Sequence, residues 1–297
     1  MTKKIKFRYY KISIHIDRNL TNAELTKTMV RTGLLQKIQN TQKPQNVYLI
    51  NGHNAFTKKL ATQTNIYCFE KHRQTHLPTI GTTVADIERP IELEEDESIM
   101  EKNFFLLNNQ ALYILYQEKK EGYWASSLGQ YLTSLYAKEG VTITLDAILS
   151  RESYEKFMRF GYIKKIELSF ASPSDALLQE WGISIEDRFG IATADDADFQ
   201  IGIKFPTKKT WVENAKNRFL ERFIAHDGEI KKALVKGSEL EGDPLSELNL
   251  SSDVLEETRS VRSDTTANFE THLVEHLEDI DRTMNPEILE IIHENNT

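Results

Sequence analysis

The fold class follows from the stretch Phe104-Phe105-Leu106-Leu107-Asn108-Asn109-Gln110-Ala111-Leu112-Tyr113-Ile114-Leu115-Tyr116. Two apolar runs, residues 104–107 and 111–116, flank the pair Asn108-Asn109 in this stretch. Because asparagine tolerates positive φ angles, this pair suits the tight turn of a β-hairpin. The stretch therefore predicts two antiparallel strands that are joined at Asn108-Asn109.

Periodic segments on both sides of this hairpin predict further strands and helices. Apolar residues that alternate with polar ones indicate half-buried strands, and apolar residues three or four apart indicate amphipathic helices. Strands are expected at residues 5–16, 46–50, 65–69, 141–145, 166–170, 199–205 and 230–235. Helices are expected at residues 23–39, 127–138, 150–160, 174–181, 207–224 and 268–281, with Ser150 as the cap of the third, and residues 78–89 are expected to form a loop. The sequence thus predicts an α+β fold with a mixed, largely antiparallel sheet, flanking helices and a helical, acidic C-terminal end.

The net charge of −8 hides a strong segregation of charge along the chain. Residues 1–80 carry 14 Lys and Arg against 3 Asp and Glu, whereas residues 237–297 carry 3 against 16. The acidic stretch near residues 90–101 suggests a boundary between a basic N-terminal α/β domain, residues 1–95, and a second α/β domain with an acidic helical C-terminus, residues 96–297. Such asymmetry favours nucleic-acid contact on the basic side. The alternative is that the basic and acidic halves attract each other.

Composition places the chain among soluble proteins of a reducing compartment. The single cysteine, Cys68, excludes a disulfide framework within one chain. No window approaches the roughly 18 uninterrupted apolar residues of a membrane helix, and the basic N-terminus lacks the apolar segment of a signal peptide. We therefore expect a cytoplasmic protein, although a membrane partner remains open. Cys68 lies in an apolar run and is expected to be a small buried residue, not a nucleophile.

Clustered lysines and arginines, some with aromatic neighbours, are the candidate phosphate-binding residues. They are Arg8, Lys58, Lys59, Lys71, Arg73, Lys164, Lys165, Lys208, Lys209, Lys216, Arg218 and Arg222. Such side chains pair with phosphates, and no base-reading motif accompanies them. The expected partner is therefore double-stranded DNA, bound independently of its sequence and with a steep salt dependence. The alternative for each cluster taken singly is a solvated face.

Two sequence patterns suggest metal-dependent chemistry as an alternative to DNA binding. Residues 272–276 have the sequence His-Leu-Val-Glu-His, in which two histidines four residues apart share a helix face and could bind zinc. Asp198, Glu229 and Lys231 could instead form a Mg²⁺-dependent nuclease site, because the triplet 229–231 has an E-x-K form. Short charged triplets are common by chance, and a third zinc ligand is not evident. No catalytic residue, metal or cofactor is therefore expected, and a protein-interaction module is a further alternative.

The order of elements also resembles a group of anti-phage proteins. The stretches that carry the resemblance are 66–73, Pro78, 91–97, 104–117, the helix from Ser127 and 145–170. In layout, over roughly residues 1–260, they are similar to the Rex exclusion protein A and the B subunit of the Kiwa system of prophages and defence islands. The resemblance implies DNA binding, dimerisation, a small membrane-protein partner and a role in phage exclusion or abortive infection. The acidic tail and the 272–276 motif are not features of those relatives.

Overall fold

The computed structural model describes most of the chain, and the chain divides into two compact units. The described residues are 2–16, 23–39, 47–50, 52–60, 65–74, 77, 79–81, 88–95, 97–108, 110–119, 122–136, 140–171, 198–225, 230–251, 253–262 and 266–294. Unit 1 comprises Met1–Phe7, Ile12–Leu145 and Glu257–Leu289. Unit 2 comprises Arg8–Lys11, Asp146–Glu256 and Glu290–Thr297.

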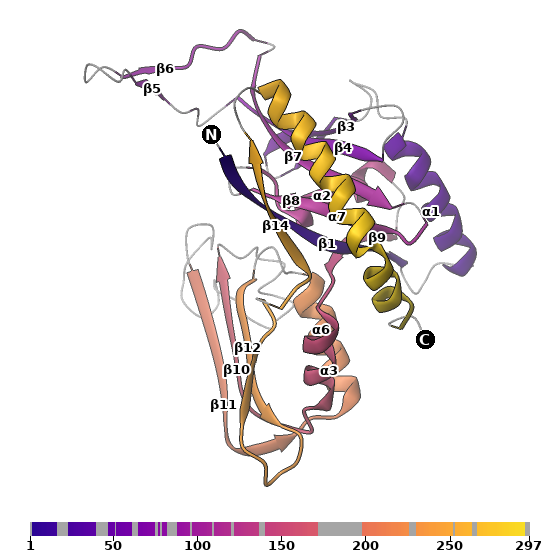
Figure 1. Ribbon diagram of the computed structural model, residues 1–297, viewed down its shortest axis with the longest axis vertical. Helices are drawn as coiled ribbons and strands as arrows, with labels where there is room; N and C mark the ends of the chain where they lie inside the picture. Colours follow the sequence, from indigo (N-terminus) through magenta and orange to yellow (C-terminus); the bar gives the residue numbers. More distant parts are fainter. Residues whose placement is uncertain are drawn as a thin grey trace. The chain divides into compact units, whose positions relative to one another are not determined.

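Unit 1 is built on an eight-stranded sheet (Figure 1). Its main path runs β14 (Glu256–Arg262), β1 (Thr2–Ile16), β8 (Tyr113–Glu118), β7 (Ile99–Asn108), β4 (Ile66–Arg73), β3 (His53–Lys59) and β2 (Tyr48–Ile50), and β9 (Val141–Ala147) pairs with β1. The pairs from β2 to β8 along this path are antiparallel. A two-stranded ribbon, β5 (Thr79–Gly81) with β6 (Glu88–Pro90), lies in a segment where a loop was expected. The α+β class and the largely antiparallel pairing are thus confirmed.

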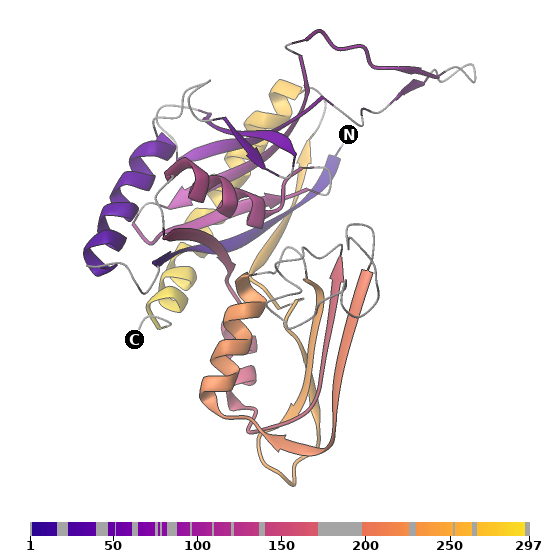
Figure 2. The same ribbon diagram turned by 180° about the vertical axis from the view of Figure 1, so that it is seen from behind.

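Helices cover both faces of this sheet. In Figure 1, α7 (Thr266–Glu294) crosses in front of the strands. In Figure 2, which shows the molecule from behind, α2 (Ala125–Tyr136) lies in front of them. The helix α1 (Ala23–Gln39) contacts α2. Burial on two faces explains why the run 104–107 is apolar throughout, since all four side chains are at most 7% exposed. The helical, acidic C-terminal end is confirmed by α7.

The predicted hairpin is present, but its turn is wider than expected. Asn108 pairs with Tyr113, so the strands are connected through residues 109–112 and not through Asn108-Asn109 alone. The Asn108 side chain accepts hydrogen bonds from the backbone N–H groups of Gln110 and Ala111. Leu112 takes the positive φ of 55° that closes the turn. The asparagine therefore acts through its side chain in a longer loop.

The structure divides the chain elsewhere than at residues 95 and 96. That position lies inside unit 1, because β4 pairs with β7 across it from Ile66↔Leu106 to Arg73↔Ile99. An acidic stretch marks a solvated connection, and it need not separate two hydrophobic cores. The residues that complete unit 1 come from the far end of the chain, in β14 and α7.

Unit 2 contains a four-stranded antiparallel sheet in the order β11 (Asp198–Thr210), β10 (Tyr162–Ala171), β12 (Ile230–Ser238) and β13 (Ser246–Asn249). The helix expected from residue 207 begins later, as α6 (Glu213–Ala225). Residues 207–210 instead extend β11, because Thr210 pairs with Tyr162 and Lys209 with Ile163. The prediction of a helix start at Thr207 was therefore wrong, since cross-strand pairing outweighs the local helical pattern there.

One face of the unit 2 sheet is covered by α6 and α3 (Arg151–Arg159), as Figures 1 and 2 both show. Ser150 caps α3 as predicted, accepting a hydrogen bond from the backbone N–H of Ser153. Phe157 of α3 packs edge-on against Trp211, with 4.8 Å between ring centroids, and stacks with Phe219 of α6. A β-carbon on Gly237 would lie 3.2 Å from the ring of Phe160, just after α3. Gly237 therefore marks the face of β12 that lies against the helices.

Within the described part of the chain, no helix combines the length and the apolar content that a membrane-spanning segment needs.

Candidate functional site

Three lysines stand side by side across unit 2. Lys165 of β10 is directly opposite Lys204 of β11 and also directly opposite Lys236 of β12. Directly opposite residues share a face of the sheet, and neighbouring strands are about 4.8 Å apart, so the row is about 10 Å long. Lys232 lies on the same face because it is four residues from Lys236 on the same strand. We call these four residues, Lys165, Lys204, Lys232 and Lys236, the lysine face.

The lysine face lies on the side of the sheet away from α3 and α6. Gly237, next to Lys236, faces the helices, and Val235 and Ala233 are fully buried. Because side chains alternate along a strand, Lys236 and Lys232 face away from the helices. Lys204 is exposed and the other three lysines are half-buried. The arrangement presents a line of ammonium groups on the face of the antiparallel sheet that lies away from α3 and α6.

One carboxylate, Glu167, organises this face from its centre. It accepts hydrogen bonds from Lys165, from Lys232 at 2.6 Å and from the side-chain amide of Gln200 at 3.1 Å. The hydrogen bonds from Lys165 and Lys232 lower the pKa of Glu167 to about 2. Glu247, an exposed residue of β13, is opposite Lys236 at the margin. Among the described residues, the four lysines of the face therefore share two carboxylates, which leaves an excess of positive charge.

Like charges directly opposite each other weaken a sheet, by roughly 0.2–1 kcal/mol for each pair. The row contains two such pairs, Lys165 with Lys204 and Lys165 with Lys236. An anion that lies along the row would remove this repulsion, and ammonium groups act as point-charge ligands of phosphate. The described side chains of this face can therefore attract an anion electrostatically.

Several of the basic residues predicted to bind phosphate are engaged within the protein. Arg8 donates a hydrogen bond of 3.0 Å to Glu256, and Arg73 and Lys71 lie 3.1 Å and 3.7 Å from Glu101. These carboxylates neutralise the charges that were expected to meet DNA. Arg8, Lys71 and Arg73 thus have carboxylate partners within the protein, and their role in binding phosphate stays a prediction.

Lys216 is also unsuited to contact DNA, because only 7% of the residue is exposed. Its ammonium group donates a hydrogen bond to the carbonyl of Met158, and burial lowers its pKa. The sequence pattern put Lys216 on the polar side of a helix. The observed helix begins six residues later than predicted, at Glu213, and carries Lys216 on the side where α3 packs.

The other predicted residues are divided between the two units. Lys164, Lys208 and Arg218 donate hydrogen bonds to backbone carbonyls, those of Pro206, of Glu241 and Asp243, and of Asn214. Lys58 and Lys209 are exposed, and Lys59 is half-buried. The side chain of Arg222 lies outside the described residues. Lys58, Lys59, Lys71 and Arg73 belong to unit 1 and the rest to unit 2, so only Lys165 was both predicted and found in the lysine face.

Sequence reasoning missed Lys204, Lys232 and Lys236. A signal for two of them exists, because Lys232 and Lys236 flank Leu234 at a spacing of two and therefore share one face of the predicted strand. The signal that brings Lys204 beside Lys165 is the register between β10 and β11. That register joins residues far apart in the chain and has no local sequence signature.

The alternative sites gain no support from the described side chains. Among them, no three His, Cys, Asp or Glu residues gather as metal ligands would, and His272 of the zinc motif bonds Glu275 at 3.2 Å instead. Asp198 is the first residue of β11 and Lys231 is the second residue of β12, and both strands flank β10. The side chains of these two residues and all of Glu229 lie outside the described residues. Cys68 is buried as predicted, and burial with the nearby Glu70 raises the pKa of its thiol.

A comparison with protein-family models matches residues 1–280 to DUF6731, a family of unknown function. A search of curated proteins gives no match to the chain.

Proposed function

Since the chain belongs to the DUF6731 family of unknown function, we propose its function from its own residues: it binds double-stranded DNA through the lysine face, without sequence preference and without catalysing a reaction. The single observation that supports this proposal is the row Lys204–Lys165–Lys236. The row is a repulsive arrangement in the free protein, and a polyanion relieves it. The binding proposed from sequence is kept, but it is assigned to a different set of lysines.

The shape of the face favours an extended polyanion over a small anion. The row Lys204–Lys165–Lys236 forms a line about 10 Å long. Duplex DNA carries one charge for about every 1.7 Å of its axis, so a segment of this length carries roughly six phosphate charges. Among the described residues beside the row, the amides that could read base edges already have partners, because Gln200 bonds Glu167 and Asn249 accepts a hydrogen bond from Ser251. Contacts of this kind position DNA and do not specify its sequence.

The decisive experiment is a salt titration of binding to a short labelled duplex, followed by fluorescence anisotropy. Each phosphate contact contributes about 0.9 to the slope of log affinity against log salt. We expect the Lys204→Gln/Lys236→Gln variant to lower this slope by about two and to weaken binding at least tenfold at about 50 mM salt.

The matched control is Lys209→Gln/Arg218→Gln, which removes the same charge from unit 2. Lys209 is on the side of the sheet opposite to the lysine face, because it pairs with Ile163, and Ile163 is opposite the helix-facing Gly237. Arg218 is exposed on α6. Binding by this control should change less than twofold. Equal losses in the two variants would refute the lysine face as the site, and cleavage of the duplex when Mg²⁺ is supplied would favour the nuclease alternative.

We propose further that DNA binding serves bacterial anti-phage defence, in the cytoplasm and as a homodimer with a membrane-protein partner. The support is the resemblance in layout to prophage exclusion proteins and, for the compartment, the single cysteine. Phage plating on cells that express the wild type should fall relative to cells that express Lys204→Gln/Lys236→Gln. Equal plating removes the defence role, and light scattering of the purified protein tests the dimer.

A further inference from the structure

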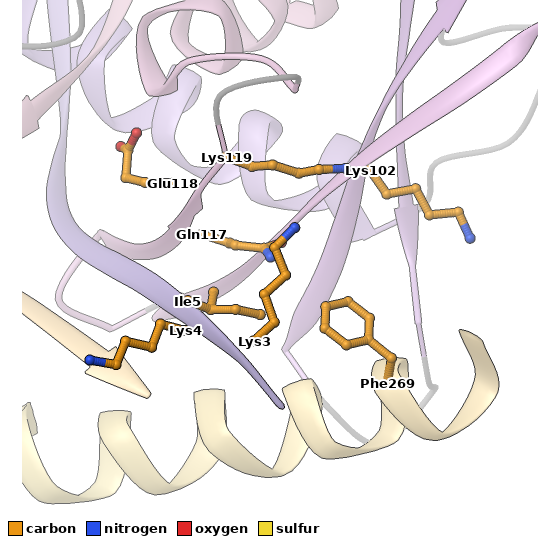
Figure 3. A pocket seen from close by; sticks show the side chains of 8 residues that line it. All are labelled: Lys3, Lys4, Ile5, Lys102, Gln117, Glu118, Lys119 and Phe269. Atoms are coloured by element: carbon orange, nitrogen blue, oxygen red, sulfur yellow. The ribbon is translucent and has the colours of Figure 1, made fainter. Parts of the chain in front are cut away.

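A second cationic feature lies in unit 1 and is separate from the lysine face. A hollow of about 310 Å³ opens where the start of β1, the end of β8, β7 and the first turns of α7 meet (Figure 3). Its lining consists of Lys3, Lys4, Ile5, Lys102, Gln117, Glu118, Lys119 and Phe269. This volume is at the lower end of the range for small-molecule sites.

Positive charge dominates the inside of the hollow. Lys102 forms an ion pair with Glu270 at 2.9 Å. Burial lowers the pKa of Lys102, but the hydrogen bond and the charge of Glu270 raise it, and the net shift is upward. Lys3 and Lys119 have no carboxylate partner among the described residues. Figure 3 shows the side chain of Glu118 directed away from the centre of the hollow, and that of Lys4 likewise. Lys3 and Lys119 therefore bring to the hollow two ammonium groups that no described carboxylate pairs with.

Gln117 gives the hollow a buried donor whose orientation is known. Only 4% of this residue is exposed, and its Oε1 accepts a hydrogen bond of 3.1 Å from the backbone N–H of Phe104. A backbone N–H can bond the oxygen but not the amide nitrogen, so the two amide atoms are assigned by this contact. The amide nitrogen then has no hydrogen-bond partner in the described part of the chain. Gln117 and Lys3 both line the hollow, so each contributes a donor to it.

The remaining wall of the hollow is apolar. The ring of Phe269 faces the hollow from the fourth position of α7, and Ile5, 4% exposed, lies opposite on β1. The first turn of a long helix also carries a partial positive charge, which favours a nearby anion. An aromatic face beside cationic donors suits a ligand that joins a phosphate to a planar ring.

We propose that this hollow binds a mononucleotide, with its phosphate on Lys3, Lys119 and the amide of Gln117 and its base against Phe269. The inference does not depend on DNA binding by the lysine face, because the two sites belong to different units and share no residue.

The test is isothermal titration of the full chain with AMP, GMP, CMP and UMP, and separately with inorganic phosphate and adenosine. We expect at least one mononucleotide to bind more tightly than about 1 mM, a weak but measurable affinity. Phosphate alone and adenosine alone should each bind at least tenfold more weakly, because each keeps only half of the contacts. No binding by any mononucleotide overturns the proposal.

Matched variants separate this site from general surface charge. Lys3→Gln should weaken nucleotide binding at least fivefold, whereas Lys58→Gln, which removes the same charge from an exposed position of unit 1 outside the lining, should change it less than twofold. Gln117→Glu keeps the acceptor for Phe104 and replaces the donor with a carboxylate oxygen, so it should abolish binding while thermal unfolding stays near that of the wild type. If Gln117→Glu fails to fold, the variants Lys3→Gln and Lys58→Gln at exposed positions still decide, and equal effects of these two variants refute the site.

The variant that removes two lysines of the lysine face tests whether the two sites are independent. Lys204→Gln/Lys236→Gln should leave nucleotide binding unchanged, and AMP should not compete with duplex DNA. Loss of nucleotide binding in that variant would show that nucleotides bind the lysine face, which overturns the hollow as their site. Failure of DNA binding with retained nucleotide binding would instead reject only the proposed function.

Discussion

Two sheets in this protein place charged residues opposite each other in contrasting ways. Between β4 and β7 of unit 1, Lys71 is opposite Glu101 and Glu70 is opposite Lys102, so opposite charges face each other. On β10 of unit 2, Lys165 is opposite lysines on both sides. The residue types are the same, but the first arrangement stabilises its own sheet and the second weakens its own. Cross-strand register therefore decides which basic residues have an acidic residue directly opposite them and which have another lysine.

The strongest test of this contrast reverses charge on the lysine face. Lys204→Glu/Lys236→Glu should weaken duplex binding about 100-fold at low salt, which corresponds to about 2.7 kcal/mol, because repulsion replaces two phosphate contacts. Fluorescence anisotropy measures the loss. Lys209→Glu/Arg218→Glu has the same net charge and serves as the control. If the control loses as much affinity, the net charge of the protein, and not the position of these lysines, determines DNA binding.

The next test breaks the unit 1 arrangement. Glu101→Ala should lower the free energy of unfolding by about 2 kcal/mol, because it leaves Arg73 and Lys71 half-buried without their shared carboxylate. Chemical denaturation measures this change, and DNA affinity should stay within twofold of the wild type. Glu92→Ala, at an exposed carboxylate, should change stability little. A gain in DNA binding by Glu101→Ala would mean that Lys71 and Arg73 contribute to binding when they are released.

The third test concerns the acid dependence of Glu167. Its folded pKa of about 2 is below the ordinary value of 4.5, so the ionised form stabilises the fold. This contribution is complete above the unfolded pKa and is lost as the pH falls from about 4.5 toward 2. Wild type should therefore be more stable than Glu167→Gln at neutral pH, and the difference should shrink across that acid window. Urea unfolding at a series of pH values checks it, and a constant difference would contradict the ion pairs.

The smallest expected effect is a gain in stability. Lys204→Gln removes one of the two repulsive pairs and should raise the free energy of unfolding by about 0.5 kcal/mol, while DNA binding weakens. Denaturant unfolding of the DNA-free protein measures this gain. A loss of stability would show that Lys204 contributes more through packing than it costs through repulsion.

Local sequence signals were sufficient for most of the elements. The helix expected at residues 23–39 is α1, with the same bounds, and Ser150 caps α3 as its side chain predicts. These features depend on neighbours within one turn of a helix, which the sequence displays directly. The short helix expected near residues 174–181 falls outside the described residues.

Features set by distant partners could not be derived in the same way. Residues 207–210 read as a helix start, yet Thr210 pairs with Tyr162, some fifty positions earlier. The same holds for the site, since Lys204 becomes part of a row only through its register with Lys165. The division into units is likewise not evident from the sequence, because β14, which pairs with the N-terminal strand β1, comes after the long segment Asp146–Glu256 of unit 2.

That chain order has a consequence during synthesis. The N-terminal strand β1 lies between β8 and β14 in the sheet of unit 1, and β14 ends only at Arg262. At about 5–20 residues per second, the ribosome needs roughly 5–20 s to make the intervening unit 2. Throughout that interval the nascent sheet lacks its last strand and the helix α7, and it exposes an edge and an apolar face of the kind that aggregate. Folding of unit 1 is therefore completed late in translation, and a nascent chain halted before β14 is the form most in need of a chaperone.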